Sequence, residues 1–406
     1  MNIKYFNTFE TYANIFKNDE NKREINLYKL NNCIPYGHTL YYPNILFKSS
    51  DNSFILPLME RTMSLKINSI YETKSMKFDY VKKIVTNTYE EPLFFFIYNT
   101  DNYFHFLYDS LPYLISYLYL KKQICNLKLL MQYPNEQKKD MYPFVEEFLE
   151  ILDINKKDII IIDEYSQYKE LYISTSYTHD IDSNLPPRKE IYQFYQDIVN
   201  IVNEKFIQLK ISTPKKIYVS RRTWLHNDLK NIGTNYTSRR KLMNEDELVE
   251  KLKNDGYEEV FTELLTTIEK IIYFANATHV IGAIGGGVSN VLFSPKTTVL
   301  EVLVSPTFLD INNRFVYSLN NVNVCYNYNS KHVESGEMKT YMRVKTKDNK
   351  ILGEIEKIYD DKLLVSYTDG SNTGWNAQNS YKQIELSIND VEKLDDGLNS
   401  PWLINL

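Results

Sequence analysis

The sequence predicts an α/β protein with two Rossmann-like domains in tandem and a small all-β, SH3-like appendage. Strand-like apolar runs alternate twice with helical patterns, which is typical of parallel sheets covered by helices on both faces. The 406 residues are too many for one ordinary core. Beyond Met338 the pattern changes to short alternating strands separated by turn signals.

The first predicted domain covers residues 1–190. Its first 90 residues give only weak strand signals, such as those at 44–47 and 80–85. After Pro92 the alternation becomes clear. The predicted elements are a strand at 93–98, a helix at 102–120, a strand at 127–131, a helix at 143–152, and strands at 159–162 and 171–174.

The second predicted domain covers residues 191–330 and follows a long helical pattern from about 189 to 209. Asn244 and Glu247 have the spacing of a capping box at the start of one of its helices. The appendage is predicted at 337–390, where turn signals separate short strands. The predicted elements of the second domain are strands at 216–220, 257–261, 279–281 and 299–303, and helices at 244–252 and 266–276.

The composition limits the class of protein. A net charge of -5 gives no overall basic field, so nucleic acid is not expected as a partner. The three cysteines are far apart in the sequence, which predicts reduced thiols and no metal site. The apolar segment 94–120 is interrupted by Asp101, His105, Asp109 and Pro112, so no transmembrane segment is expected. We expect a cytoplasmic enzyme or binding protein.

Four of the 12 glycines lie within six residues, at Gly282 and at Gly285, Gly286 and Gly287. The pattern predicts a turn between a strand ending at Ile281 and a helix starting near Val288. Ligands bind at this edge of a parallel sheet, and a helix N-terminus there offers N–H groups to a phosphate. Glycine permits close approach and positive φ. The spacing matches neither GxGxxG nor a P-loop, and a tight turn without a ligand is the alternative.

Two arginine pairs stand beside predicted strands and helices. Arg221 and Arg222 follow a strand, and Arg239 and Arg240 precede a helix. Such side chains could make bidentate contacts to a diphosphate, or they could be solvated surface residues. Glu301 lies in the strand at 299–303 and could accept hydrogen bonds from ribose hydroxyls; a surface or core role is the alternative.

His105 and Asp109 are four residues apart, so a helix places them on one face. Polar side chains in so apolar a helix are costly unless they face a cleft or each other. Either side chain could act as a general base, or Asp109 could orient the imidazole. The alternative is a mutually satisfied pair with no catalytic role.

Four segments in order resemble the family-61 glycosyltransferases, the group that contains the extracellular O-linked N-acetylglucosamine transferases and the plant xylan xylosyltransferases. The segments are NYFHFLYDSLPYL, IYVSRRTW, SRRKLMNEDELVEKL and VIGAIGGGVSNVLFSPKTTVLEVL. They extend over residues 102–303, which is about half of the chain.

The resemblance implies a GT-B fold and an inverting, metal-independent transfer without a cofactor. The donor would be a nucleotide-sugar, such as UDP-N-acetylglucosamine or UDP-xylose, held mainly by the second domain. The acceptor would be a glycan or glycoprotein approaching the first domain. The implied donor-binding residues are Arg221, Arg222, Arg239, Arg240, Gly285, Gly286, Gly287, Ser289, Asn290 and Glu301, and the implied catalytic residues are His105 and Asp109.

One position departs from the family pattern. The family usually has histidine where this chain has Ile284, and alanine where it has Gly286. The departure removes an imidazole that could contact phosphate or sugar. Two alternatives therefore remain: a non-catalytic glycan- or protein-binding module that retains the fold, and another nucleotide-dependent enzyme such as an epimerase. The membrane anchor common in eukaryotic members is not found, which suggests a bacterial or large-virus enzyme. A homo-oligomer is a further expectation.

Overall fold

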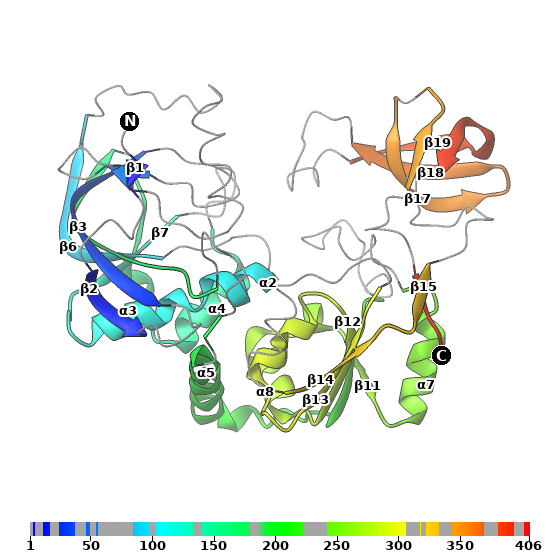
Figure 1. Cartoon of the computed structure of the whole chain (residues 1–406), viewed down its shortest axis with the longest axis horizontal. Coiled ribbons are helices and arrows are strands. Elements are labelled where there is room, and N and C mark those ends of the chain that lie inside the picture. Colours follow the sequence, from blue (N-terminus) through cyan, green and yellow to red (C-terminus); the bar gives the residue numbers. More distant parts are fainter. Residues whose placement is uncertain are drawn as a thin grey trace. The chain divides into compact units, whose positions relative to one another are not determined.

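The computed structural model forms two compact units, Met1–Lys210 and Ile211–Leu406 (Figure 1). Predicted roles for an acceptor domain and a nucleotide-sugar domain, divided at residue 190, stay predictions. Within the part of the chain that is described, none of the helices has the length and apolarity needed to span a membrane. The structure describes residues 3–4, 11–16, 24–36, 46–48, 54–55, 84–96, 103–132, 140–163, 165–178, 187–188, 190–222, 242–305, 317, 322–332, 343–348, 350–368, 381–393 and 402–406.

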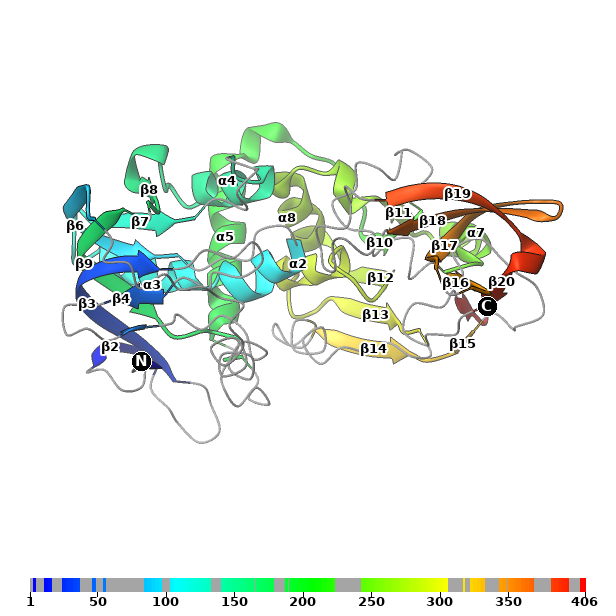
Figure 2. The same cartoon turned by 90° about the horizontal axis from the view of Figure 1, so that it is seen from above.

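The first unit is built on a nine-stranded mixed sheet. Its strands are β1 (Ile3–Lys4), β2 (Thr11–Phe16), β3 (Ile25–Tyr36), β4 (Leu46–Lys48), β5 (Phe54–Ile55), β6 (Asn87–Phe95), β7 (Lys128–Met131), β8 (Ile159–Ile161) and β9 (Ser166–Ser174). Four neighbours, in the order β8-β7-β6-β9, run parallel (Figure 2). Antiparallel β3 extends the sheet beyond β9.

The parallel part of this sheet has the strand order found at the centre of a doubly wound sheet. Numbered by position in the chain, its four strands are ordered 3-2-1-4. The order therefore reverses between β6, the first of them, and β9, the fourth. The end of β6 is fully buried at Leu93, Phe94 and Phe95, as expected for a strand covered on both faces. The predicted strand at 80–85 lies mostly outside the described residues.

The helices of the first unit confirm the predicted alternation but interrupt its longest element. The predicted helix at 102–120 is divided by a π-helical turn, in which Leu111 N donates to Phe106 O over 2.8 Å. Pro112 follows that turn and has no N–H group to continue the pattern. Among the described residues the helices are α2 (Tyr103–His105), the π-helix η2 (Phe106–Ser110), α3 (Tyr113–Lys121), α4 (Pro143–Ile151), η3 (Lys156–Asp158), α5 (Ile191–Lys205) and η4 (Ile207–Leu209).

The second unit contains a five-stranded, fully parallel sheet. Its strands are β10 (Lys216–Val219), β11 (Glu258–Val260), β12 (His279–Ala283), β13 (Val299–Leu303) and β14 (Asn323–Asn327), the last of which was not predicted. The order β11-β10-β12-β13-β14 is 2-1-3-4-5 by position in the chain, the order of a doubly wound sheet. Its switch point lies between β10 and β12, where such sheets bind ligands.

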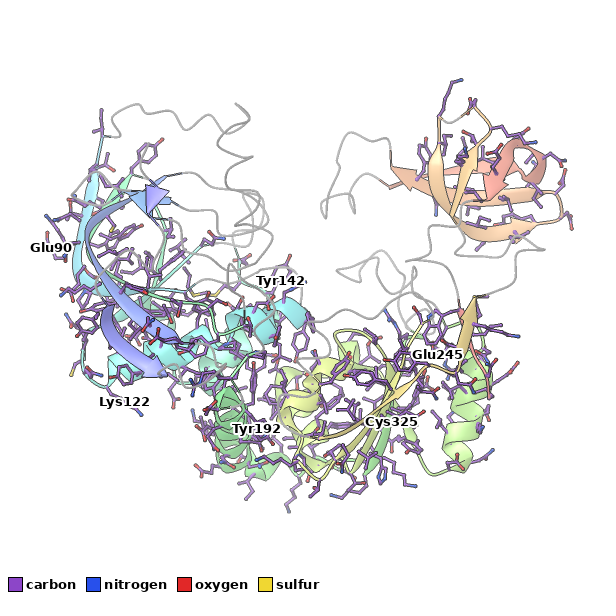
Figure 3. All side chains as sticks on the ribbon, in the orientation of Figure 1. Glu90, Lys122, Tyr142, Tyr192, Glu245 and Cys325 are labelled. Atoms are coloured by element: carbon purple, nitrogen blue, oxygen red, sulfur yellow. The ribbon has the colours of Figure 1, made fainter. Side chains whose placement is uncertain are left out.

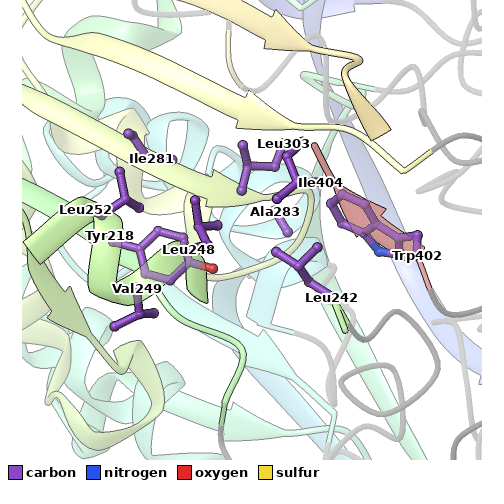
Figure 4. Close-up of a cluster of buried hydrophobic side chains, with 10 residues drawn as sticks. All are labelled: Tyr218, Leu242, Leu248, Val249, Leu252, Ile281, Ala283, Leu303, Trp402 and Ile404. Atoms are coloured by element: carbon purple, nitrogen blue, oxygen red, sulfur yellow. The ribbon is translucent and has the colours of Figure 1, made fainter. Parts of the chain in front are cut away.

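Helices cover both faces of this sheet. Helix α7 (Glu245–Asn254) lies on one side, and α8 (Thr267–Asn276) lies on the other (Figure 1). On the α7 side, alternate strand residues pack with apolar residues of the helix and of the C-terminal strand (Figure 4). The cluster consists of Tyr218, Leu242, Leu248, Val249, Leu252, Ile281, Ala283, Leu303, Trp402 and Ile404. Full burial of each large apolar side chain contributes about 1.5–3 kcal/mol.

The capping box predicted at Asn244 and Glu247 is wrong. Asn244 occupies the N-cap position of α7, but its side chain makes no bond to the helix. Its amide instead binds the backbone of Ile404, with Oδ1 accepting from N over 3.1 Å and Nδ2 donating to O over 2.7 Å. A capping box is found at the start of α8, where Thr266 and Glu269 exchange hydrogen bonds.

The rest of the second unit is antiparallel. Strands β16 (Arg343–Thr346), β17 (Leu352–Tyr359), β18 (Lys362–Thr368), β19 (Tyr381–Ser387) and β20 (Val391–Lys393) form a five-stranded sheet in the order β19-β18-β17-β16-β20. The described residues of the region predicted as a β-appendage therefore form mainly strands, with one 3-10 helix, η10 (Ile388–Asp390), and the SH3-like closure stays a prediction. Strand β15 (Ser330–His332) pairs with β21 (Trp402–Ile404), which carries the C-terminal segment back to the parallel sheet.

Candidate functional site

Arg221 and Gly285 meet at the switch point of the parallel sheet in the second unit. Arg221 lies two residues beyond the end of β10, and its Nη1 donates to Ile284 O, beyond the end of β12, over 2.9 Å. A Cβ built on Gly285 would lie 3.5 Å from the same nitrogen. The structure therefore brings together an arginine and a glycine that the sequence placed at the same sheet edge.

The glycines of this turn differ in the space around the position where a side chain would begin. Among the described glycines only Gly256 has a positive φ, so the glycines of the turn do not adopt the left-handed backbone that glycine permits. A Cβ on Gly282 would lie 2.7 Å from Val288 Cγ2, and one on Gly287 would lie 2.8 Å from Val219 Cγ1. These two glycines allow close packing. Gly285 is the one whose missing Cβ leaves room beside Arg221.

The segment after the turn is a 3-10 helix, η8 (Val288–Phe293), which begins where the sequence predicted the start of a helix. Its polar residues bind back to the turn: Ser289 Oγ donates to Gly286 O, and Asn290 Nδ2 donates to Gly287 O over 2.8 Å. Both side chains are buried, as is Ile284. Ser289 and Asn290 therefore hold the shape of the glycine turn.

Glu245, which is labelled in Figure 3, is a buried carboxylate that accepts a hydrogen bond from the backbone of Arg221. Its Oε1 accepts from Arg221 N over 2.7 Å, from Tyr218 Oη over 2.8 Å and from Ser220 Oγ over 3.3 Å. Its Oε2 is buried and has no hydrogen-bond partner in the described part of the structure. Burial raises the pKa of the Glu245 carboxyl, although these hydrogen bonds act in the opposite direction.

Burial and a neighbouring negative charge have opposite effects on the guanidinium of Arg221. Burial lowers the pKa of Arg221, and the negative charge of Glu245 opposes that shift, with smaller contributions from Tyr218, Tyr317 and Glu263. Tyr317 also accepts a hydrogen bond from Gly285 N over 3.3 Å and is fully buried. We call Arg221, Glu245, Gly285 and Tyr317 the switch-point cluster.

The sequence interpretation missed two members of this cluster. Glu245 stands inside one of the quoted segments, directly after the residue predicted as a helix cap, so its position carried a signal. Tyr317 is one of 34 tyrosines, and nothing in its neighbourhood distinguishes it. Only the folded chain shows that its hydroxyl reaches the glycine turn.

Arg222 points to a different set of partners from Arg221. Its Nε and Nη2 donate to the two oxygens of Glu259 over 2.8 and 2.6 Å, and its Nη1 donates to Asp246 over 2.6 Å. The Glu259 hydrogen bonds raise the pKa of Arg222. Arg222 thus links β10 to β11 and α7. Arg239 and Arg240 lie outside the described residues.

Glu301 lies in the middle of β13 rather than at its carboxyl end. Its Oε1 accepts a hydrogen bond from Asn327 Nδ2 on the neighbouring strand β14, over 2.7 Å. The predicted contact with ribose therefore involves a carboxylate that already has a partner within the sheet. In the part of the chain that is described, no cluster of three or more His, Cys, Asp or Glu side chains could hold a metal ion.

His105 and Asp109 form a close pair in the first unit. His105 Nδ1 lies 2.6 Å from Asp109 Oδ2, and Thr178 Oγ1 donates to Asp109 Oδ1 over 3.4 Å. The Asp109 side chain is 2% exposed and that of His105 is 21% exposed. Thr178 follows β9 and the pair follows β6, so these residues lie beyond the ends of the two strands that flank the reversal of strand order. The π-helical turn carries Asp109, a feature frequent at functional sites.

The comparison with protein families agrees with the resemblance seen in the sequence. Residues 103–300 match the family described as Glycosyltransferase 61. The matched segment includes the His105–Asp109 pair, Arg221, Glu245 and the glycine turn, whereas Glu301 and Tyr317 lie beyond its end. A search of curated proteins found no match to the chain. The match supports a glycosyltransferase.

Proposed function

From the family-61 match and the chemistry of these two sites, we propose that the protein is an inverting glycosyltransferase that uses a nucleotide-sugar donor. The observation that carries the proposal is the meeting of Arg221 Nη1 with the end of β12 beside Gly285, at the switch point of a doubly wound sheet. A guanidinium beside a glycine turn suits a diphosphate, because its N–H groups can bind the charged phosphate oxygens in pairs.

In the second unit, Arg221 would bind the diphosphate and stabilise the charge that develops on it as the sugar leaves. Fixed donors aimed at developing charge commonly supply about 3–4 kcal/mol each. We withdraw Arg222 from this role, because its three donor groups are taken up by Glu259 and Asp246. Ser289 and Asn290 would act indirectly, by keeping the turn in shape.

In the first unit, His105 would be the general base and Asp109 its partner. Asp109 has both oxygens engaged by His105 and Thr178 and is almost fully buried, whereas the imidazole is more exposed. A carboxylate at Nδ1 fixes the tautomer in which Nδ1 carries the hydrogen and Nε2 is basic. A matched base contributes about 10²–10⁴-fold to the rate.

The proposed reaction is a single displacement. The acceptor hydroxyl oxygen attacks the anomeric carbon as the bond from that carbon to the diphosphate oxygen breaks, and the configuration inverts. The hydroxyl proton passes to His105 Nε2, and the bonding electron pair leaves with the nucleoside diphosphate near Arg221. Because a guanidinium carries the leaving-group charge in this scheme, we expect transfer to proceed in the presence of EDTA.

The test separates binding from chemistry. A thermal-shift screen against UDP-, GDP- and CMP-sugars identifies the donor, because a ligand that binds the native state stabilises it by mass action. Arg221→Gln should abolish the stabilisation. Lys216→Gln, which removes a positive charge from the amino end of the same strand, should preserve it. His105→Ala should keep donor binding and lose transfer to a glycan acceptor.

Three outcomes would contradict the proposal in whole or in part. Stabilisation by none of these nucleotide-sugars would favour the alternative of a non-catalytic glycan- or protein-binding module. Conversion of the donor without any acceptor would favour another nucleotide-dependent reaction, such as epimerisation. A product with retained anomeric configuration would contradict the single displacement while leaving glycosyl transfer intact.

A further inference from the structure

The two oxygens of the buried Glu245 carboxylate are unequally hydrogen-bonded, and the carboxylate lies next to the proposed donor site. Oε1 accepts three hydrogen bonds, while the buried Oε2 accepts none in the described part of the structure. A buried charge without full hydrogen bonding is costly. Moreover, Glu245 binds the backbone N–H of Arg221, the residue proposed to receive an anion. A diphosphate would therefore arrive close to an existing negative charge.

We propose that Glu245 is a positioning residue of the donor site, and that it takes up a proton when the diphosphate of a nucleotide-sugar binds at Arg221. This inference rests on the proposed function. In its ionised form Glu245 fixes the backbone of Arg221 and balances the guanidinium charge. When the ligand supplies negative charge to Arg221, the carboxylate becomes redundant there and is neutralised by a proton on Oε2.

The surroundings of Glu245 favour this coupling. Its immediate neighbours are Tyr218, Ser220 and Arg221 at the end of β10, so Arg221 provides the nearby positive charge. Negative side chains near the same groups come from β11 and the segment after it, at Glu259 and Glu263, and from α7 itself. The C-terminal strand contributes apolar Trp402 and Ile404 to the neighbouring core. The other ionisable groups of the set are Tyr317 and Asp246.

The sign of the pH dependence follows from like-charge repulsion. Burial already raises the pKa of Glu245 above its ordinary value, and a diphosphate beside Arg221 raises it further. Between the pKa of the free chain and that of the complex, binding takes up a proton, so donor affinity increases as the pH falls. Above the pKa of the complex the affinity no longer depends on this group, and below the pKa of the free chain it is again constant.

The experiment is calorimetric titration of the whole chain with UDP-N-acetylglucosamine, whose diphosphate has no ionisation of its own near neutral pH. Titrations in PIPES and in imidazole, which differ in enthalpy of ionisation, give the number of protons taken up. We expect uptake approaching about one proton per donor and an affinity that changes by up to about tenfold per pH unit within the window.

Three variants assign the proton to Glu245. Glu245→Gln keeps an oxygen acceptor for Arg221 N but cannot titrate, so it should bind the donor without proton uptake and with a flat pH profile. Tyr218→Phe removes a hydrogen bond that stabilises the ionised carboxylate, so it should shift the profile to higher pH. Glu247→Gln, an exposed carboxylate on the same helix, should behave like the wild type.

The outcomes separate this inference from the proposed function. Binding without proton uptake in the wild type, or unchanged uptake in Glu245→Gln, overturns the role of Glu245 and leaves the donor site intact. If Glu245→Gln does not fold, an unshifted profile in Tyr218→Phe overturns it. Absence of binding to UDP-N-acetylglucosamine and to GDP- and CMP-sugars overturns both proposals together.

Discussion

Gly285 and Gly287 are two residues apart in one turn, yet their replacement by alanine should have opposite effects. A Cβ at Gly287 would lie 2.8 Å from Val219 Cγ1 and 2.9 Å from Thr262 Oγ1, so Gly287→Ala should cost about 1–3 kcal/mol of stability. A Cβ at Gly285 meets Arg221 Nη1 at 3.5 Å, an ordinary contact. Gly285→Ala should keep the melting temperature and lower donor affinity by about tenfold or more, about 1.4 kcal/mol.

Urea denaturation and donor titration of both variants check this contrast. Equal destabilisation of the two variants would show that Gly285 is also a packing glycine. Equal donor affinity of Gly285→Ala and wild type would show that no ligand approaches this backbone.

Asp109→Asn tests whether the carboxylate orients the imidazole of His105. An amide can present either a donor or an acceptor to Nδ1, so the basic tautomer is no longer fixed. We expect kcat to fall by about 10²–10⁴-fold, as for loss of a matched base, while the thermal shift given by the donor is retained. Transfer assays at saturating donor measure the effect. A wild-type kcat would leave Asp109 with only a structural role.

At the scale of single residues, the sequence predicts where a charged side chain lies better than which group it binds. The position after a strand end was enough to place Arg221 beside Gly285, because parallel strands end at a common edge. The same argument applied equally to Arg222, yet its guanidinium binds Glu259 and Asp246. Which way a side chain points depends on the carboxylates that other elements bring near it, and a single sequence does not contain that information.

The C-terminal strand β21 should stabilise the start of α7. Asn244 exchanges two hydrogen bonds with the backbone of Ile404, and Met243 N donates to Trp402 O over 2.9 Å. Asn244→Ala leaves both backbone groups of Ile404 without that partner, so we expect a loss of about 1–3 kcal/mol. Hydrogen exchange should become faster at residues 402–404. Thr266→Ala, which removes a true cap from α8, should cost about 1 kcal/mol without affecting those amides.

A loss in Asn244→Ala without faster exchange at residues 402–404 would mean that the side chain acts as a local cap after all. The sequence could not decide between these cases. Asn244–Glu247 and Thr266–Glu269 have the same spacing, and only the second pair forms the capping box. The partner of Asn244 lies 160 residues away in the chain. Local spacing predicts where a helix begins more reliably than what its first side chain binds.

At the scale of the whole molecule, alternation of strands and helices predicted parallel sheets, and both units contain them. Strand order was beyond the sequence, because neighbours in a sheet are selected by packing between distant segments. The reversals of order beside β6 and beside β10 explain why the conspicuous residues of each unit follow those strands. The weak sequence pattern near the N-terminus shows the limit, since β3 could not be found from period or composition.

The division into two units makes a prediction about the intact chain. Each unit has its own sheet and its own core, so scanning calorimetry should resolve two unfolding transitions. A nucleotide-sugar at about 100 times its Kd adds about 2.7 kcal/mol to the stability of the state that binds it. For a unit of this size we expect a shift of roughly 5–10 °C in one transition. Hydrogen exchange assigns the shifted transition to Ile211–Leu406. Arg221→Gln should remove the shift and Lys216→Gln should keep it. An equal shift of both transitions would contradict a donor site built within the second unit, because a ligand stabilises only the cooperative unit whose native state it binds.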